Sequence, residues 1–491
     1  MKTALPKFVL AGTVLCVLTL TAMGATGFTT QVSPSSQTNA TEPSVAVDRS
    51  DGTIYVAWQA GGTWVARSDD GGRSFVQTPI ADFFGRDIGD VDARVGGPTP
   101  CTTATTTCLP GTHRVYVSSI ERLPLPLQAH LAMSDDRGAH WTINDLAAFN
   151  PSFIDRPWMA VFPSTVSAAH DQVYIAYHDF SASQINVAAS NDGGKTFGPS
   201  VDVLAQNGLA FANSFCNTVP SGIEVDMQTA EVYVLWITAD PVANVGQGCN
   251  VTQIQPFHQV WVAHSPPAGA GGLTTWDAHK VFDGGPNTNT DKIFATLGVD
   301  DSGIPGVAGN VYAVFPDNLA APDVWDIWFA HSSDRGMTWS SPVKVNSDKG
   351  THYFPWIAAG SSGRVDFIWL TSPDTTPTDT EQSPWSVTFA QTTNGTSSTP
   401  KFNQTSASSG VMHVGGICTV GIFCSVTGGN RDLADSISIV IDRGGSAALA
   451  WTDQGRVLNG PTHITYGCVP AQQSAVVGAS SRLSCKGPAG P

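Results

Sequence analysis

Four ionisable residues of the types used in acid–base catalysis occur in two short segments of the sequence. Asp155 and Arg156 precede one apolar stretch, and His178 and Asp179 follow the next. Paired carboxylates carry out glycoside hydrolysis, one as an acid and the other as a base or nucleophile. An adjacent arginine or imidazole would shift the pKa of one carboxyl relative to the other. We therefore expect Asp155 and Asp179 to form such a pair, with Arg156 or His178 tuning one member.

Other polar and aromatic residues stand at similar places beside apolar stretches. Carboxylates could accept hydrogen bonds from sugar hydroxyls, and aromatic rings could stack on a sugar ring. The candidates for substrate binding are Glu42, Asp291, His352, Tyr353, Trp158 and Trp356. The same oxygen-rich set could hold Ca²⁺; the sequence requires no cofactor and leaves the identity of any metal open. No nucleophile elbow, phosphate loop, dinucleotide fingerprint or His-Glu-x-x-His word occurs.

Three short sequence motifs, called words below, recur along the chain and predict the strands that would position these residues. An apolar residue, Ala, any residue and Ser or Thr recur from Val65–Ser68 to a degenerate seventh copy at Ile464–Gly467. The mean spacing is about 66 residues, which suits a repeat architecture with long loops. A second word, such as Gln172–Tyr177, precedes each copy and alternates with period two, as a strand does. A third apolar word, such as Pro157–Val161, comes earlier still.

Repeated units of three strands with room for a fourth predict an all-β fold, a β-propeller with four antiparallel strands per blade. The copies favour seven blades, with six as the alternative. Phe28–Val32 would supply the outer strand of the last blade and close the ring. We expect a propeller domain over residues 28–467 and a C-terminal tail over residues 468–491.

This topology brings the residues before each first strand and after each second strand to one axial face. Rim loops are polar in any propeller, so the expectation concerns the funnel as a whole. The residues before first strands are Glu42, Asp155, Arg156, Asp291, Lys292, His352, Tyr353 and Asp435. Those after second strands are Gln59, Glu121, Arg122, His178, Asp179, Asp240, Asp317 and Asp453. Arg94 and Arg431 could also approach this face.

A more specific pattern, Ser-x-Asp-x-Gly-x-Ser/Thr-aromatic, follows the first word in four blades. The copies are Ser68–Phe75, Ser190–Phe197, Ser332–Trp339 and Ser134–Trp141, the last with His140 in place of the hydroxyl. An Asp carboxylate at this position can accept N–H bonds across a tight turn, and Gly supplies a positive φ. The pattern resembles the Asp-box (BNR) repeat of sialidase-like propellers. The resemblance implies a structural role, on the face opposite the funnel, for Asp70, Asp136, Asp192 and Asp334.

The resemblance also implies activity on glycans. Sialidases of this family hold an acidic sugar with three arginines, the first in an Arg-Ile-Pro word of the first blade. This chain has Thr41-Glu42-Pro43 there. A funnel rich in carboxylates would repel an anion, so we expect a neutral glycan or glycoconjugate. The sequence leaves catalysis open against a non-catalytic propeller that binds a glycan or a cell-surface protein, and against an assembly or stability factor.

The composition excludes several other classes of protein. The chain has 24 Lys and Arg against 40 Asp and Glu, a net charge of -16, so no nucleic-acid partner is expected. Hydrophobic residues make up 41%, enough to bury a large core rather than stay disordered. The 49 Gly and 32 Pro residues suit turns between many short strands.

The N-terminal segment predicts export. Residues 1–27 read as a secretory signal peptide, with Lys2 and Lys7 before the apolar run Phe8–Ala22. Cleavage is expected at Ala22–Gly24 or Ala25–Gly27, with an uncleaved signal anchor as the alternative. No other segment has the length of a membrane span, so we expect a secreted mature chain with no membrane span.

The cysteines are consistent with an oxidising compartment. Nine are present, and one, Cys16, lies in the signal. Proximity favours four local disulfides in an exported chain. The expected pairs are Cys101–Cys108, Cys216–Cys249, Cys418–Cys424 and Cys468–Cys485.

Overall fold

The structure is a computed structural model. It describes residues 27–81, 87–121, 127–148, 153–179, 184–214, 218–240, 257–267, 273, 275–375, 382–419, 424, 428–442 and 444–470. The predicted signal, most of the predicted tail, and Cys216, Cys249 and Cys485 lie outside these residues. Within the described part, no helix is both long enough and apolar enough to span a bilayer.

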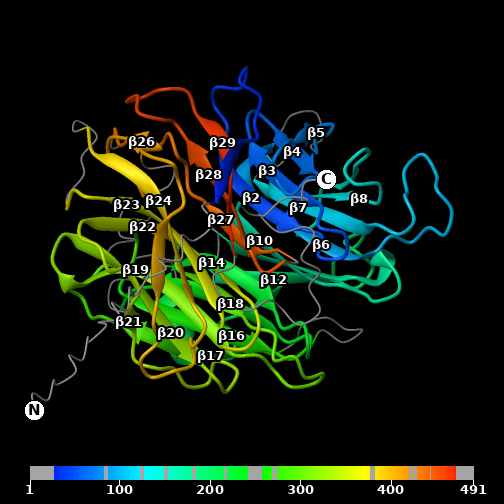
Figure 1. Ribbon diagram of the computed structural model, residues 1–491. Helices are drawn as coiled ribbons and strands as arrows, with labels where there is room; N and C mark the ends of the chain where they lie inside the picture. The colour runs from blue at the N-terminus through cyan, green and yellow to red at the C-terminus, as the bar shows by residue number, and fades with distance from the viewer. Residues whose placement is uncertain are drawn as a thin grey trace, which may run out of the picture.

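The described strands form a seven-bladed β-propeller with four antiparallel strands in each blade, which confirms the predicted fold class and blade count (Figure 1). Blade 1 contains β2 (Thr41–Val47), β3 (Ile54–Gln59), β4 (Thr63–Ser68) and β5 (Val76–Gln77). Blade 2 contains β6 (Asp87–Pro98), β7 (His113–Glu121), β8 (Gln128–Ser134) and β9 (Thr142–Asn144). Blade 3 contains β10 (Ile154–Phe162), β11 (Gln172–Asp179), β12 (Gln184–Ser190) and β13 (Val201–Asp202).

The remaining blades follow the same plan. Blade 4 contains β14 (Thr218–Val225), β15 (Val232–Thr238), β16 (Gln259–Ser265) and β17 (Asp277–Asp283). Blade 5 contains β18 (Thr296–Val299), β19 (Val311–Ala321), β20 (Val324–Ser332) and β21 (Val343–Lys344). Blade 6 contains β22 (Thr351–Ala359), β23 (Val365–Ser372), β24 (Pro384–Thr392) and β25 (Asn403–Ser406), with β26 (His413–Val414) also paired to β24. Two short helices, η1 (Ala168–His170) and α1 (Gly208–Ser214), lie in connections.

Blade 7 closes the ring with strands from both ends of the chain. It contains β27 (Ser438–Ile441), β28 (Ala447–Asp453), β29 (His463–Val469) and, on the outside, β1 (Phe28–Gln31). Phe28 lies opposite Cys468 in the antiparallel pair of β1 and β29, so the blue and red strands meet in Figure 1. The predicted closing strand is therefore confirmed.

The core lies between neighbouring blades. The first strands of successive blades contact one another around the ring, and the second strands are buried on both sides, as in β15, where every residue is buried. A sheet covered on both faces favours such continuous apolar runs. Most second strands carry a large aromatic residue that is almost completely buried: Trp58, Tyr177, Trp236, Phe315, Trp369 and Trp451.

The four Ser-x-Asp-x-Gly hairpins share one geometry. Asp70 Oδ1 accepts the N–H groups of Arg73 and Ser74, both at 3.0 Å, and Oδ2 accepts the Ser74 hydroxyl at 2.6 Å. Asp192 and Asp334 accept the corresponding bonds from Thr196 and Thr338. Asp136 accepts the backbone N–H of His140 at 2.9 Å and lies 2.6 Å from its Nδ1, so the imidazole replaces the missing hydroxyl. The carboxylates thus hold the turns, which follow the third strands.

Buried aspartates at the same end of the molecule join neighbouring blades. Asp226, just after β14, accepts the N–H of Gly309 in blade 5 at 2.6 Å. Asp300, just after β18, accepts the N–H of Gly363 in blade 6 at 2.7 Å and the Tyr312 hydroxyl at 2.6 Å. The bonds from Gly309 and Gly363 each satisfy a buried acceptor and join two neighbouring blades.

Two of the predicted disulfides are present, Cys101–Cys108 and Cys418–Cys424. Cys468 is also disulfide-bonded. Its predicted partner, Cys485, and the predicted pair Cys216–Cys249 lie outside the described residues.

Candidate functional site

The first strands of several blades are irregular near the axial face. The pairing register between the first and second strands shifts at one residue in each of blades 1, 2, 3 and 6: Glu42, Asp90, Arg156 and Phe354. These residues have φ values of 54°, 53°, 57° and 56°, the left-handed region. A non-glycine residue in this region costs roughly 1–3 kcal/mol and persists where its surroundings impose it, often at functional sites. Because the same bulge occurs in four blades, it is a regular feature of the axial face and not a local irregularity.

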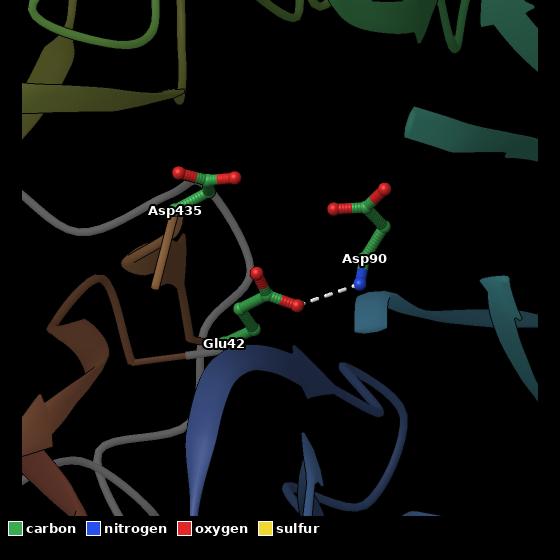
Figure 2. A group of neighbouring side chains, drawn as sticks. All are labelled: Glu42, Asp90 and Asp435. Carbon is green, nitrogen blue, oxygen red and sulfur yellow. Dashed lines mark hydrogen bonds between the residues drawn. The ribbon is translucent and has the colours of Figure 1, made fainter. Parts of the chain in front are cut away.

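Three carboxylates from three blades meet beside these bulges. One oxygen each from Glu42, Asp90 and Asp435 lies within 4.8 Å of the others. Figure 2 shows Glu42 between the other two, with its Oε2 accepting the backbone N–H of Asp90 at 2.7 Å. We call Glu42, Asp90, Asp435 and the two arginines that contact them, Arg156 and Arg431, the axial cluster.

Arg156 and Arg431 supply the positive charge of the axial cluster. Arg431 forms a two-pronged ion pair with Asp435. Arg156 lies with Nη2 3.5 Å from Asp435 and donates its backbone N–H to Asp90 Oδ2 at 3.0 Å. Its Nη1 is buried without a hydrogen-bond partner, and its guanidinium stacks 4.4 Å from the centre of the Phe294 ring.

The carboxyl groups of the axial cluster differ in acidity. Burial, and then the negative charge of Asp435, raise the pKa of Glu42 to about 7. Burial, followed by Asp155 and Glu42, raises the pKa of Asp90 well above its ordinary value. Burial would also raise the pKa of Asp435, but Arg156 and Arg431 outweigh it and lower that pKa. The cluster therefore favours the ionised form of Asp435 and opposes ionisation of Glu42 and Asp90.

The structure separates the expected catalytic pair in blade 3. Asp155 lies opposite His178 in the ladder of β10 and β11, whereas Asp179 lies opposite Ile154. Opposed residues share a face and successive residues alternate, so Asp155 and Asp179 point to opposite faces of the blade and are not brought together. Asp155 instead pairs with Arg156 Nε at 3.7 Å. Burial lowers the pKa of His178 to about 4, so its imidazole is neutral at neutral pH.

Most of the other candidate binding residues are covered. Trp158 is only 4% exposed and packs against Phe294 and Trp356, with ring centres 5.4 Å and 5.1 Å away. Tyr353 is 6% exposed and packs 5.0 Å from Trp385. Neither ring therefore presents an open face for stacking, and half-buried Trp356 is the more accessible.

His352 and Asp291 also lie away from the axial cluster. His352 is fully buried, with Nδ1 2.9 Å from the carbonyl of Trp325 and Nε2 3.2 Å from Asp348. Asp291 lies in blade 5 beside Lys292. Of the six residues expected to bind substrate, only Glu42 belongs to the axial cluster.

Two cavities among the described residues lie at outer strands. One, of about 270 Å³, is lined in blade 2 by the Cys101–Cys108 loop, Asp135 and His140. The other, of about 310 Å³, is lined in blade 6 mainly by hydroxyl groups, Asp348 and Gln404. Neither includes a set of carboxyls with opposed pKa shifts, so the axial cluster is the stronger candidate for chemistry.

Sequence reasoning missed Asp90. In blades 1, 3 and 6 the residue with the left-handed backbone stands directly before a proline, as Glu42, Arg156 and Phe354 do. Asp90 holds the same place in blade 2 but is followed by Val91, so the proline that marks this place in the other three blades is missing.

No protein-family model matches the chain, and no curated protein matches its sequence. Solved structures similar to it include a phage phi92 endosialidase, with 11% identity, a TM-score of 0.44, and 92% of this chain and 70% of that chain covered. An ulvan lyase of a polysaccharide lyase family has 10% identity and a TM-score of 0.47, with 88% and 93% covered. The fucose-specific lectin from Aleuria aurantia has 11% identity and a TM-score of 0.39, with 76% and 96% covered. At these identities the likeness concerns the propeller fold alone.

Proposed function

We propose that this protein binds a neutral glycan at its axial face and hydrolyses it, with Glu42 as the general acid and Asp435 as its ionised partner. The proposal depends on one observation. Glu42 and Asp435 approach within 4.8 Å, and the pKa of Glu42 is raised while that of Asp435 is lowered. Carboxyl groups whose environments push their pKa values apart are the usual acid and base of a hydrolase.

Each group then has a definite task. Protonated Glu42 would donate its proton to the glycosidic oxygen as the bond to the leaving sugar breaks. Asp435 would attack the anomeric carbon and form a glycosyl–enzyme bond, and Arg156 and Arg431 would keep it ionised. Water, deprotonated by the now ionised Glu42, would then break that bond, which releases the sugar, frees Asp435 and returns the proton to Glu42. Retaining glycosidases separate their carboxyls by about 5–5.5 Å and inverting ones by about 6.5–9.5 Å, so the close approach favours a retaining reaction.

The charge pattern favours a neutral substrate. Glu42 stands in the first blade where sialidases of the resembled family place an arginine. Arg156 and Arg431 are both engaged by Asp435. An anionic sugar would have to compete with Asp435 for either guanidinium.

The proposal also includes the Asp-box resemblance of the fold and the export of the protein from the cell. The four hairpins with one shared geometry support the Asp-box resemblance. The disulfides Cys101–Cys108 and Cys418–Cys424 suit an exported protein. An extracellular glycan or glycoconjugate is therefore the proposed partner.

A panel of chromogenic neutral glycosides and one sialoside tests the proposal. We expect the wild type to hydrolyse a neutral member and Glu42→Gln to lose about 10²–10⁴-fold in kcat for a poorly activated leaving group. Asp70→Asn, a change in a hairpin on the opposite face, serves as the control and should keep the activity. Full activity in Glu42→Gln, or a preference for the sialoside, would contradict the assignment.

Burial favours one second function, glycan binding without hydrolysis. Glu42 and Asp435 are only 6% and 3% exposed, which limits the approach of a glycosidic bond. A glycan array would then detect binding by the wild type that Asp155→Asn weakens, because Asp155 is the more exposed carboxylate of this face. Glycan binding with no hydrolysis across the panel would favour this function over catalysis.

A further inference from the structure

Two buried carboxyl groups lie together at the axial end of blade 5, outside the axial cluster. Asp291 lies in the connection between β17 and β18, and Asp317 lies in β19. Their exposed fractions are 3% and 0%. An isolated buried carboxylate is costly unless hydrogen bonds, a countercharge or a metal compensates it.

The oxygens of this pair lack the usual compensation. Both oxygens of Asp317, Oδ1 of Asp291 and the hydroxyl of fully buried Thr290 have no hydrogen-bond partner. The nearest cation, Lys292, has its Nζ 3.9 Å from Asp291 Oδ1, beyond hydrogen-bonding distance, and it lies over the Trp325 ring at 4.8 Å. Four buried oxygens therefore remain without a partner on two segments that are hydrogen-bonded to each other.

A neighbouring carboxylate shows what full compensation looks like. Asp326 stands opposite Asp317 in the ladder of β19 and β20. It accepts the Asn346 side-chain amide at 2.8 Å and lies 3.5 Å from Lys344 Nζ. Of these two opposed residues of one ladder, Asp326 is therefore compensated and Asp317 is not.

Hydrogen bonds fix the segment that carries Asp291 against the strand that carries Asp317. The backbone N–H of Asn289 donates to Asn318 Oδ1 at 2.9 Å, and that of Asp291 donates to Asn289 Oδ1 at 2.8 Å. The indole N–H of Trp328 binds the carbonyl of Asp317 at 3.1 Å. The backbone is thus held while the carboxyl oxygens stay outside the network, an arrangement suited to an added ligand.

The acidity of Asp317 agrees with this geometry. Burial, and then the negative charge of Asp291, raise its pKa to about 7, and the backbone amide of Leu319 offsets only part of the rise. That amide makes no hydrogen bond of ordinary geometry to the carboxyl oxygens. The two carboxyl groups therefore repel one another, and a cation between them would relieve the repulsion.

We propose that Asp317, Asp291 and Thr290 form a site for one divalent cation, Ca²⁺. The available ligand atoms are all oxygens, which Ca²⁺ prefers and Zn²⁺ does not. Two carboxylates balance its charge. The bound ion would tie the connection before β18 to β19, close to blade 6, where Phe354 donates its N–H to the carbonyl of Lys292 at 3.0 Å.

The axial cluster is the competing place for the cation, and its contacts make it the weaker one. Arg431 already occupies both oxygens of Asp435, and Glu42 Oε2 accepts the N–H of Asp90. A cation there would displace an arginine, whereas a cation at Asp317 would displace no hydrogen bond of the carboxylate oxygens.

Calorimetric titration of the chelator-treated full chain with CaCl₂, together with thermal melts at pH 8, tests the site. We expect one Ca²⁺ per chain, a melting temperature raised by several degrees, and at least tenfold weaker binding in Asp317→Asn. Glu42→Gln is the matched control, because it changes a buried carboxyl of the other cluster, and it should bind Ca²⁺ as the wild type does.

A second measurement separates loss of the site from loss of the fold. In chelator, Asp317→Asn should melt at or above the wild-type temperature, because it removes an uncompensated buried charge; in CaCl₂ the order should reverse. No Ca²⁺ binding by the wild type at millimolar concentration, wild-type binding by Asp317→Asn, or loss of binding in Glu42→Gln alone would each overturn the proposal.

Discussion

The hairpin face and the axial face of the propeller treat the same kind of residue in opposite ways. At the hairpin face, Asp70, Asp192 and Asp334 accept several hydrogen bonds each; burial would raise the pKa of each, but the bonds from Ser74, Thr196 and Thr338 outweigh it and lower the pKa. At the axial face, Glu42 and Asp90 are held on left-handed backbone with raised pKa values. One end uses carboxylates to stabilise the chain, whereas the other keeps them in an environment that opposes ionisation, as catalytic and binding sites do.

The largest effect on stability is expected at Asp435. Asp435→Asn would leave Arg156 and Arg431 without their shared countercharge, and breaking a buried ion pair costs about 3–5 kcal/mol of unfolding free energy. Urea unfolding at pH 7 measures the loss. A loss of this size would show that the ion pairs of Asp435 with Arg156 and Arg431 stabilise the fold.

Asp155→Asn is the matched control for that experiment. Asp155 pairs with the same Arg156 at 3.7 Å, but its side chain is 31% exposed. Solvent screens such a pair, so a loss below about 1 kcal/mol is expected. Equal losses in the two variants would mean that burial does not set the strength of the pairing.

The pH dependence of stability should be governed in part by Glu42. Its pKa, raised mainly by burial to about 7 from 4.5, lets the folded state keep a proton that the unfolded chain releases. This contribution is fully present below pH 4.5 and is lost as pH rises through 7, so the unfolding free energy falls by on the order of 3 kcal/mol.

Glu42→Gln isolates that contribution. Glu224 and Asp317 have similarly raised pKa values, so the wild-type profile alone mixes several groups. The difference between wild-type and Glu42→Gln unfolding free energies, measured by urea titration from pH 4.5 to 8.5, should slope in favour of the variant at high pH. A flat difference would place the pKa of Glu42 near its ordinary value.

The smallest effect is expected in a single hairpin. Asp70→Ala removes the acceptor for two backbone N–H groups in an exposed turn, which should cost about 1 kcal/mol. Thermal unfolding at pH 7 would detect it. Its neighbour Asp69, whose surface ion pair with Arg67 has a side chain 48% exposed, provides the control, since Asp69→Ala should change stability by less than about 0.5 kcal/mol. If Asp69→Ala lost more stability than Asp70→Ala, the hydrogen bonds of Asp70 would not be what stabilises the hairpin.

The fold could be predicted because its signals are local and repeated. The period-two words became the second strands, the alanine words became the third, and Phe28–Val32 contained the closing strand β1. Turn chemistry is equally local: the hydrogen bonds of Asp70 lie within four residues of it. No distant part of the chain is needed to recognise either feature.

The site was predicted less completely because it depends on register and on contacts between blades. Sorting residues by strand end placed Glu42, Arg156 and Asp435 at the same face, and they do meet. The sorting could not show that Asp179 points away from Asp155, since that depends on the pairing of β10 with β11. Nor could it show that Trp158 is covered by Phe294, which belongs to a different blade.

The closure of blade 7 has a consequence for how the protein is made. Ile464 donates its backbone N–H to Ser33 Oγ across 431 positions of the sequence. The seventh blade can be completed only after Val469 has left the ribosome, so until then the faces of blades 1 and 6 that blade 7 covers stay open. Exposed apolar surface of this kind makes an incomplete fold prone to aggregation. A change that weakens the pairing of β1 with β29 would therefore first be noticed as poor yield rather than as lost function.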